Sequence, residues 1–502
     1  MFTPSPLFTD HAIVPCDQEI RIFGTADAEE SIRARLTDAF GLTVCEGGGR
    51  AFLGRFEIIL PPLKPGAGPL TLKLTAHSGE SFTASDLRAG YLFLAGGQSN
   101  MEMSLWNADE GQALIKTHDD PDLRYFNVPR VSVPDAAAMQ AHASARWQQI
   151  APHQGGDMSA VAYFFARKVR EETRVPVGVI DCYWGGTSIS CWIDEDTLRR
   201  SETGKRILLG YELKAGHVTM EQWQKAEDAF QADMTAWNAK VAQIKEDNPG
   251  IEWSAVEAQA GKCPWNPPDG PGSPYRPGGL AKTMLQTIVP AALTGILFYQ
   301  GESDADSAVL YEQQLLTMVL RWRKLFRNPD LPFYNVQLPM YIEDGAVDHA
   351  QWAVIRHAQE QVWRALRNTY LAVMIDAGEY NNIHPTDKRT PGERLAQLFL
   401  DRQAGRETPQ PIALYKESLG QHLAVHVSQP LEIRDGEALL FEVAGEHGSY
   451  YPAKVGIKDK CIYLTADEVP HPVRARYAWV DWGRVNVFGT SGLPLAPFIL
   501  EN

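Results

Sequence analysis

Alternating apolar and polar residues mark the first part of the chain, up to about residue 88. Segments 19–23 and 70–74 place a hydrophobic side chain at every second position, as a strand with one buried face does. Clusters of glycine and proline at 47–49 and 64–66 separate such segments and predict turns. We therefore expect residues 1–88 to form a small β-sandwich.

Beyond residue 88 the pattern changes to short apolar runs separated by helical periodicity. The runs have the length of buried strands and occupy 91–95, 177–182, 295–299, 333–336 and 370–375. Helices are predicted at 161–170, 352–366 and 390–400. The last helix carries a predicted capping box of Thr390, Pro391 and Glu393. Strands that alternate with helices predict a mostly parallel sheet covered on both faces, here over residues 89–404.

A helical insertion of about residues 200–262 interrupts this α/β pattern. Its long helix, predicted at 217–247, carries apolar residues every seven positions, at Trp223, Phe230, Trp237 and Ile244. Thr219 and Gln222 match a capping box at the start of this helix. We interpret the segment as an amphipathic insertion packed on the core, with a lid or a dimer helix as the alternative.

The last part of the chain, residues 405–502, returns to a strand-like pattern. Strands are predicted at 423–427 and 438–443, and glycine-rich turns surround them. We expect a C-terminal β-rich domain.

Composition and charge exclude several classes of protein. A chain of 502 residues is expected to hold two to four domains. Its net charge of −15 argues against nucleic acid or an anionic membrane as the main partner. Six cysteines without a CxxC pair argue against a disulfide framework and a zinc ribbon, and we expect Cys182 to be a buried thiol. We expect neither a metal nor a cofactor, while the oligomeric state stays open.

Two features of the sequence bear on its location in the cell. The first six residues contain no basic segment followed by an apolar one, and a signal peptide needs both. No apolar run approaches the length that spans a bilayer. We expect a cytoplasmic protein, or a secreted one if a leader has been removed.

Polar blocks follow four of the predicted parallel strands. The blocks are 96–101, 183–188 and 300–303, together with His384 after the strand at 370–375. The carboxyl ends of parallel strands lie along one edge of a sheet, so residues far apart in sequence can meet there. The sequence therefore predicts a ligand site at this edge.

The residue types in these blocks suit acyl transfer. Ser99 is the predicted nucleophile and His384 the predicted general base. The backbone N–H groups of Ser99 and of Gly185 or Gly186, with the side-chain amide of Gln300, are predicted to hold the oxyanion. On spacing alone, Ser99 is equally compatible with a helix N-cap in a polar loop.

The four blocks GQSNM, WGGTS, YQGES and IHP also occur together in a known family. In this order they resemble the SGNH-hydrolase carbohydrate esterases, especially the sialate O-acetylesterase family. Residues 5–10 and the position of the helical insertion extend the resemblance. It implies a flavodoxin-like three-layer α/β/α core with flanking all-β domains. It also implies a serine esterase that removes acetyl groups from O-acetylated sugars.

The chain departs from this family beside the predicted base. The family commonly places an Asp two or three residues before the catalytic His, where this chain has Asn382 and Asn381. Glu302 is the first substitute, because it would share a face with Gln300 if the strand continued. Asp376 is the second substitute. Weaker ones are Asp387 and Glu379.

Aromatic and basic side chains near the blocks are candidate substrate contacts. Trp265, Tyr275 and Arg276 lie in a loop rich in proline and glycine, where they would stack on a sugar or fix the loop. Arg276, Arg389 and Arg394 would bind a sugar carboxylate or form internal salt bridges. His357 falls within a predicted helix and is interpreted as a structural or surface residue.

The expected partner is an acetylated sugar or oligosaccharide, and other functions stay open. Acetyl xylan or pectin would serve as substrate as well as sialate. Asn381 and Asn382 also fit a non-catalytic carbohydrate-binding protein on an esterase scaffold. A glycosidase would use Glu302 and Asp376 as its carboxylate pair.

Overall fold

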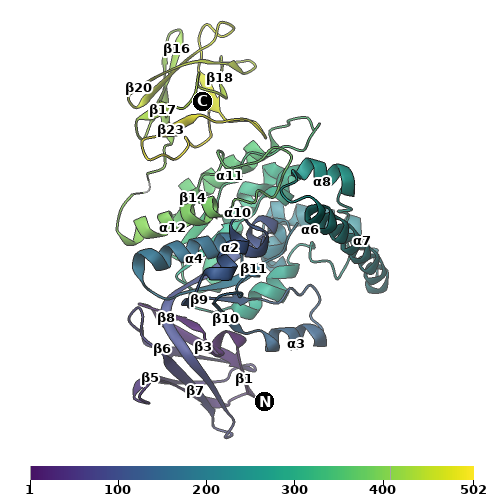
Figure 1. The fold of residues 1–502 in the computed structure, drawn as a ribbon, viewed down its shortest axis with the longest axis vertical. Helices are drawn as coiled ribbons and strands as arrows, with labels where there is room; N and C mark the ends of the chain where they lie inside the picture. The colour runs from purple at the N-terminus through teal and green to yellow at the C-terminus, as the bar shows by residue number, and fades with distance from the viewer. Residues whose placement is uncertain (1, 408, 502) are drawn as a thin grey trace.

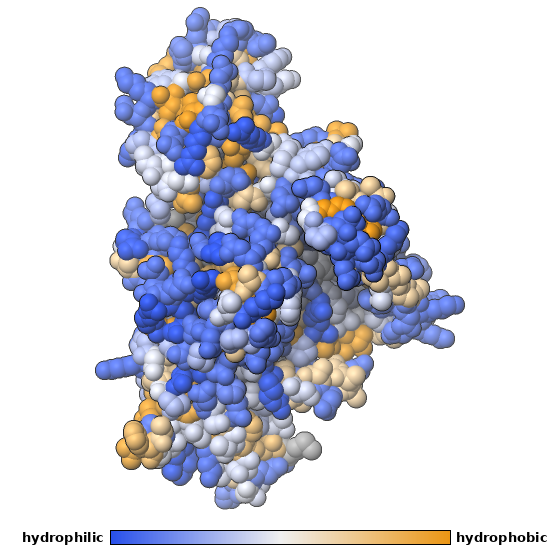
Figure 2. All heavy atoms as spheres, viewed as in Figure 1, coloured by the Kyte–Doolittle hydropathy of each residue, from blue (hydrophilic) through white to orange (hydrophobic). Residues whose placement is uncertain are grey.

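The computed structural model describes residues 2–407 and 409–501. It shows a mixed α/β protein with a large central sheet and additional all-β sheets (Figure 1). The N-terminal strands lie at one end of the long axis and the C-terminal strands at the other. Most of the face drawn in Figure 2 is hydrophilic. No described helix combines the length and apolarity needed to cross a membrane.

The central sheet runs in the order β10-β9-β11-β8-β12-β13-β14. From one edge to the other, its strands are β10 (Trp147–Ile150), β9 (Asp120–Asn127), β11 (Val177–Tyr183), β8 (Ser81–Gly97), β12 (Gly295–Tyr299), β13 (Phe333–Val336) and β14 (Thr369–Ala372). All adjacent pairs are parallel except β10 with β9. This confirms the five strands predicted from apolar runs, with β14 shorter than its run.

Helices cover both faces of this sheet. Phe93 of β8 contacts Phe165 and Phe399, which belong to α4 (Ala160–Thr173) and α12 (Arg389–Gln403). Phe298 pairs with Gly96 of β8, three residues beyond Phe93 and therefore on the opposite face. It contacts Trp322 of α10 (Tyr311–Leu325), which packs against α11 (Gln351–Ala365). The helices predicted at 161–170, 352–366 and 390–400 are thus confirmed as α4, α11 and α12.

The capping box predicted for α12 is wrong. The helix begins at Arg389, so Thr390 lies inside it. The Asp387 carboxylate instead accepts the Thr390 backbone N–H at 3.0 Å and also the Thr390 hydroxyl. Asp387 therefore satisfies the free backbone donor at this helix start.

The order in which the chain adds strands to the sheet reverses at β8, while the strands themselves stay parallel. Strands β9 and β11 lie on one side of β8, and β12, β13 and β14 lie on the other. Such a switch point creates a crevice at the carboxyl ends of the strands, where α/β proteins bind ligands. Strand β8 ends at Gly97, two residues before Ser99. The fold thus places Ser99 at the crevice.

The N-terminal strands form two sheets, one of which continues into the central sheet. Strands β1 (Thr3–Pro4), β3 (Ile20–Thr25) and β6 (Arg55–Leu60) form a separate sheet. Strands β4 (Ser31–Thr37), β5 (Thr43–Arg50) and β7 (Leu70–Ala76) pair in the order β5-β4-β7. Strand β7 pairs with the first half of β8, whose second half lies in the central sheet. The strands predicted at 19–23 and 70–74 are confirmed.

The turn predicted at residues 47–49 is wrong. These glycines lie within strand β5. A Cβ on Gly49 would overlap the carbonyl oxygen of Glu57, and one on Gly47 would lie 2.9 Å from Leu60 Cδ2. The glycines therefore allow close packing of β5 on β6.

The helical insertion consists of α6 (Glu202–Ala215), α7 (Met220–Asp247) and α8 (Trp253–Ala260). The capping box of Thr219 and Gln222 is confirmed at the start of α7. Helix α7 packs against α8, and its buried residues are Trp223, Phe230 and Ile244. Figure 1 shows these helices beside the central sheet.

The C-terminal strands form small sheets over a core of their own. One sheet has the order β15-β16-β21-β20, formed by Ala413–Leu419, His422–Val427, Cys461–Thr465 and Lys454–Lys458. The strand predicted at 423–427 is confirmed as β16, whereas the one at 438–443 begins later, as β18 (Phe441–Ala444). The core also contains Leu371, Val373 and Ile375 from the end of the central sheet. The division at residues 88 and 404 stays a prediction.

Candidate active site

Ser99 and His384 meet at the carboxyl edge of the central sheet. Ser99 is the first residue of the short helix α1 (Ser99–Glu102). Gly97 precedes it with φ 143°, and a Cβ there would overlap the carbonyl oxygen of Tyr299, so only glycine fits this turn. Ser99 Oγ lies 2.8 Å from His384 Nε2. A hydroxyl in this position can pass its proton to a neutral imidazole.

A network of hydrogen bonds holds the loop that carries His384. Asn382 Oδ1 accepts the His384 backbone N–H at 3.1 Å. Asn382 Nδ2 donates to Glu379 Oε2 at 2.7 Å, and Glu379 Oε1 accepts the Thr386 N–H at 3.3 Å. Both Asn382 and Glu379 therefore organise the loop and do not contact the imidazole.

His384 has no carboxylate partner among residues 2–407 and 409–501. Its Nδ1 makes no hydrogen bond within this part of the chain. Burial, and after it the positive charge of Lys388, lowers the pKa of His384 to about 4. The imidazole is consequently neutral near pH 7, as a general base must be.

The structure does not bring the predicted acids to His384. Both oxygens of Asp376 accept hydrogen bonds from Arg394, each at 2.7 Å. Glu302 Oε1 accepts from Asn100 Nδ2 at 2.6 Å, while its Oε2 is buried without a partner. Of the two weaker candidates, Asp387 caps α12 and Glu379 binds Asn382.

Asn100 and Lys388 form a buried network under the Ser99–His384 pair that the sequence analysis missed. Lys388 Nζ donates to Asn100 Oδ1 at 2.6 Å. Asn100 Nδ2 donates to Glu302 and, at 2.9 Å, to the carbonyl of Ile383. Burial lowers the pKa of Lys388 to about 7. The available signal was position in the chain, since Asn100 directly follows Ser99 and Lys388 lies four residues after His384, just before α12.

The predicted oxyanion donors have other acceptors in two of four cases. Gln300 Nε2 donates to Gln98 Oε1, the Thr187 carbonyl and Asp304 Oδ2, at 3.1, 3.1 and 2.5 Å. The prediction that the Gln300 amide is a free donor is therefore wrong. The Gly185 N–H donates to the carboxylate of Glu102. The N–H groups of Ser99 and Gly186 donate to no residue that the structure describes.

The candidate substrate residues lie in different surroundings. Trp265 is 49% exposed and packs over Gly186. It also contacts Tyr275 and Phe230, a residue of α7. Arg276 donates to the carbonyls of Ser273 and Ser132. Trp265 is thus open beside the site, whereas the Arg276 guanidinium is bound internally.

The other singled-out residues have structural partners. Arg389 pairs with Glu110 and Glu393, and Arg394 pairs with Asp376. His357 packs against Trp479, in agreement with the structural interpretation. Cys182 is a buried free thiol, as expected. Within the described residues, no three or more His, Cys, Asp or Glu side chains are grouped so as to hold a metal ion.

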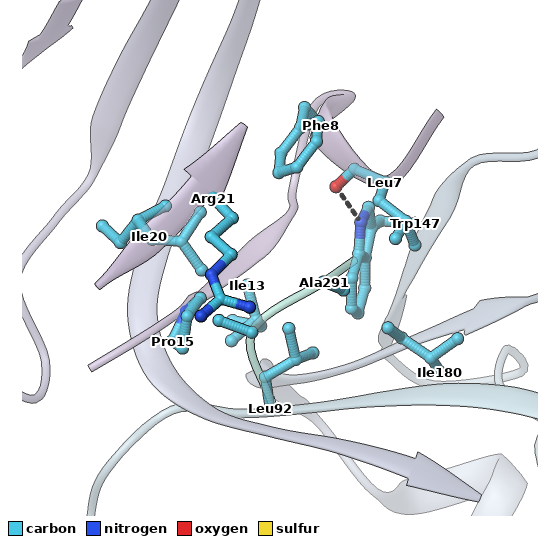
Figure 3. Close-up of a pocket in the computed structure, with 12 residues that line it drawn as sticks. Leu7, Phe8, Ile13, Pro15, Ile20, Arg21, Leu92, Trp147, Ile180 and Ala291 are labelled. Carbon is cyan, nitrogen blue, oxygen red and sulfur yellow. Dashed lines mark hydrogen bonds between the residues drawn. The ribbon is translucent and has the colours of Figure 1, made fainter. Parts of the chain in front are cut away.

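A separate recess between the N-terminal strands and the central sheet carries no catalytic group (Figure 3). Its lining is apolar apart from Arg21 and includes Leu92 of β8 and Ile180 of β11. Trp147 Nε1 donates to the carbonyl of Leu7 across it at 2.9 Å. This recess joins the N-terminal strands to the central sheet.

Comparisons with known proteins agree with the motif blocks. Residues 265–401 match the family model of the carbohydrate esterases described as sialic acid-specific acetylesterases. The mouse sialate O-acetylesterase is 24% identical over 88% of this chain and 84% of its own length. The human sialate O-acetylesterase is 22% identical over 90% of this chain and 83% of its own.

A solved structure extends this similarity to the whole chain. It is the crystal structure of a novel carbohydrate acetylesterase from Xanthomonas citri, 25% identical with a TM-score of 0.76. The match covers 100% of this chain and 99% of the other. The resemblance predicted from the four blocks is thereby confirmed: the chain is similar to a carbohydrate acetylesterase over its whole length and to two sialate O-acetylesterases over most of it.

Proposed function

We propose that this protein is a serine esterase that removes O-acetyl groups from sugars through an acetyl-Ser99 intermediate. The observation that carries the proposal is the 2.8 Å contact between Ser99 Oγ and His384 Nε2 at the carboxyl edge of the parallel sheet. The esterase relatives support the same reaction class.

The reaction proceeds in two acyl transfers. Ser99 Oγ bonds to the acetyl carbonyl carbon as its proton moves to His384 Nε2, and the carbonyl electron pair forms an oxyanion. Collapse of this intermediate breaks the bond to the sugar oxygen, which takes the proton from His384. Water then attacks the acetyl-serine by the same route and releases acetate and free Ser99.

The base works without a carboxylate on Nδ1. In a serine protease, replacing the triad Asp by Asn lowers kcat by about 10⁴. Here Asn382 holds the loop of His384, and burial keeps the imidazole neutral. We therefore expect a Ser–His dyad that turns over more slowly than an enzyme with a complete triad.

The core is of the SGNH type, a flavodoxin-like three-layer arrangement. The switch point at β8 and the helices on both faces of the sheet support this assignment.

The substrate is an acetylated sugar or oligosaccharide. Trp265 lies beside Gly186 with about half of its surface exposed, where a sugar ring can stack on it. The relatives named as sialate O-acetylesterases make acetylated sialic acid the first substrate to assay. Because Arg276, Arg389 and Arg394 all have internal partners, acetylated xylan, whose backbone carries no carboxylate, follows, and acetylated pectin is assayed after it.

Hydrolysis of 4-nitrophenyl acetate and of these acetylated glycans tests the proposal. Wild type should release acetate, whereas Ser99→Ala and His384→Ala should lose at least about 10³-fold in kcat/KM with unchanged circular dichroism. Full activity in either variant would refute the mechanism.

The unpartnered Nδ1 of His384 favours one alternative function, a carbohydrate-binding protein without catalysis. Covalent labelling of Ser99 by an organophosphonate distinguishes the two functions. An enzyme is labelled at Ser99, whereas a binding protein stays unlabelled, releases no acetate and still binds acetylated sugar.

A further inference from the structure

Glu102 lies beside the proposed nucleophile, and its carboxylate accepts hydrogen bonds from a backbone N–H and from an arginine. It is the residue three positions after Ser99 on helix α1, which places both side chains on one face of the helix. One carboxylate oxygen accepts the Gly185 N–H, and the other accepts Arg130 Nη1. The Glu102 side chain is 24% exposed and that of Arg130 is 57% exposed.

Gly185 is held between Glu102 and Ser99. A Cβ added to Gly185 would lie 3.1 Å from Glu102 Oε2 and 3.4 Å from Ser99 Cβ. The backbone of this turn therefore approaches the nucleophile as closely as packing allows. If Glu102 moved away, the Gly185–Gly186 turn would lose the hydrogen bond that holds it beside Ser99.

The hydrogen bond to Glu102 also distinguishes Gly185 from Gly186, which the sequence left as alternative oxyanion donors. Gly185 has its N–H bound to a carboxylate, whereas Ser99 and Gly186 have N–H groups without an acceptor in the described chain. An oxyanion needs donors that are free and already oriented. Of the backbone donors predicted for the oxyanion, Ser99 and Gly186 are the two whose N–H groups are free within the described chain.

We propose that Glu102 is a positioning residue of the esterase: it fixes the Gly185–Gly186 turn against Ser99, so that the N–H groups of Ser99 and Gly186 receive the oxyanion. The inference rests on the proposed acyl transfer and names a residue that neither the motifs nor the chemistry above required.

Arg130 forms an ion pair with Glu102 and so offsets the negative charge of this carboxylate beside Ser99. An unbalanced negative charge next to Ser99 would oppose the oxyanion that forms there. The guanidinium of Arg130 offsets this charge, and hydrogen bonds between ionised groups are the stronger ones in proteins. Burial raises the pKa of Glu102, whereas Arg130 and the Gly185 N–H lower it.

Steady-state kinetics of Glu102→Ala, Glu102→Gln and Arg130→Met test the proposal on 4-nitrophenyl acetate. Loss of one oxyanion donor costs about 10² to 10³ in kcat, and a loosened turn costs less. We expect Glu102→Ala to lose about 10- to 100-fold in kcat with KM nearly unchanged. Added formate should restore part of this loss, because it can occupy the site between Gly185 and Arg130.

The neutral variant separates positioning from charge. Gln at position 102 keeps an oxygen that accepts the Gly185 N–H, so Glu102→Gln should retain most of kcat. Arg130→Met leaves the carboxylate unbalanced and should lower kcat while retaining KM. The matched control is Glu171→Ala, which removes the exposed ion pair with Arg167 on α4 and should leave kcat unchanged.

Three results would overturn the proposal. Full or increased kcat in Glu102→Ala would show that the carboxylate obstructs the site. A Glu102→Gln variant as impaired as Glu102→Ala would show that charge, and not the position of the turn, is needed. A wild type that neither hydrolyses the ester nor reacts with an organophosphonate would refute the proposed function itself, and this inference with it.

Discussion

Asn382 donates a hydrogen bond to Glu379 over 2.7 Å while its own oxygen accepts the backbone N–H of His384. An amide can donate and accept in this way with one planar group, whereas an ionised carboxylate can only accept. The asparagine that stands where related esterases carry an acid is therefore built into the loop as a structural bridge. Its two contacts explain why a simple return to Asp is not expected to repair a triad.

Asn382→Asp should destabilise the loop and lower activity. The substitution would bring a second carboxylate to the oxygen of Glu379 at hydrogen-bond distance, and like charges this close repel. We expect a lower Tm at pH 8 than in the wild type, with recovery toward pH 5 as one carboxyl becomes protonated. Thermal unfolding at both pH values and hydrolysis of 4-nitrophenyl acetate check this result.

Asn381→Asp is the matched control for that experiment. Asn381 Oδ1 accepts the Asp344 N–H at 2.8 Å, an interaction that an Asp oxygen can keep. Its Tm should change little with pH relative to the wild type. A gain of activity in Asn382→Asp at unchanged Tm would instead favour a lost acid at this position.

Lys388→Met should move the acidic limb of the pH–rate profile to higher pH. The Lys388 charge disfavours the imidazolium and so lowers the pKa of His384. Removing this charge raises that pKa, so the base becomes protonated at a higher pH than about 4. Measurement of kcat/KM from pH 3.5 to 8 follows the limb independently of the absolute rate.

The exposed Lys73→Met, on strand β7, is the control for charge alone. Its acidic limb should coincide with that of the wild type. An unchanged limb in Lys388→Met would mean that Lys388 carries no charge near His384 at acidic pH.

Asn100→Ala should cost at least about 3 kcal/mol in the free energy of unfolding. It leaves both Lys388 Nζ and Glu302 Oε1 buried without their partner, and an uncompensated buried charge is strongly destabilising. Urea unfolding measures the loss. Asn107→Ala removes an exposed amide that bonds Ser104 and should cost under about 1 kcal/mol.

Asp376→Asn should leave the acidic limb and kcat/KM of hydrolysis nearly unchanged. Asp376 binds Arg394 through both oxygens, so its loss weakens an ion pair and removes nothing from His384. Glu302→Gln should have a larger effect on kcat/KM, because Glu302 belongs to the network of Asn100. Equal and severe losses in both variants would contradict this assignment.

Asp181→Asn should flatten part of the pH dependence of stability. Asp181 Oδ2 accepts from the Ser159 N–H and the Tyr183 hydroxyl, its Oδ1 is buried without a partner, and burial raises the pKa to about 7. A raised pKa means that the folded state binds the proton more tightly than the unfolded state. The resulting stability is complete below pH 4 and is lost as pH rises through about 7.

Thermal unfolding between pH 4 and pH 8 checks this prediction. Asp304, whose pKa is also raised to about 7 by burial, stays in the variant and retains its own share of the pH dependence. A slope identical to that of the wild type would show that Asp181 is ionised throughout.

The apolar runs in the sequence predicted the strands whose two faces are both buried. The polar blocks after them predicted which residues lie at the carboxyl ends of these strands. Ser99 and His384 lie 285 positions apart in the chain, yet strand ends alone indicated that they meet. The topology of a parallel sheet makes this possible, since every strand delivers its following residue to the same edge. Strand β9 was missed because Arg124 interrupts its apolar pattern and is nevertheless fully buried.

The predictions for Gln300 as an oxyanion donor and for Glu302 as the acid failed because they assumed a continuing strand. Gln300 and Glu302 were expected to share a face, but β12 ends at Tyr299. Gly301 follows with φ 147°, and a 3-10 helix begins at Glu302. The turn at Gly301 thus directs the side chains of Gln300 and Glu302 into separate hydrogen-bond networks. The alternation of residue types in the sequence does not reveal this turn.

Strand β8 links Ser99 to the N-terminal strands as well as to the central sheet. It runs from Ser81 to Gly97 with a backbone irregularity at Asp86 (φ 56°), pairing first with β7 and then with β11 and β12. We therefore expect opening of the β7–β8 hairpin to be coupled to the central sheet through this shared strand. Amide hydrogens at 81–87 should exchange with solvent as slowly as those at 91–97, in one subglobal unfolding event. The position of Ser99 therefore depends partly on strand pairing near the N-terminal end of the molecule.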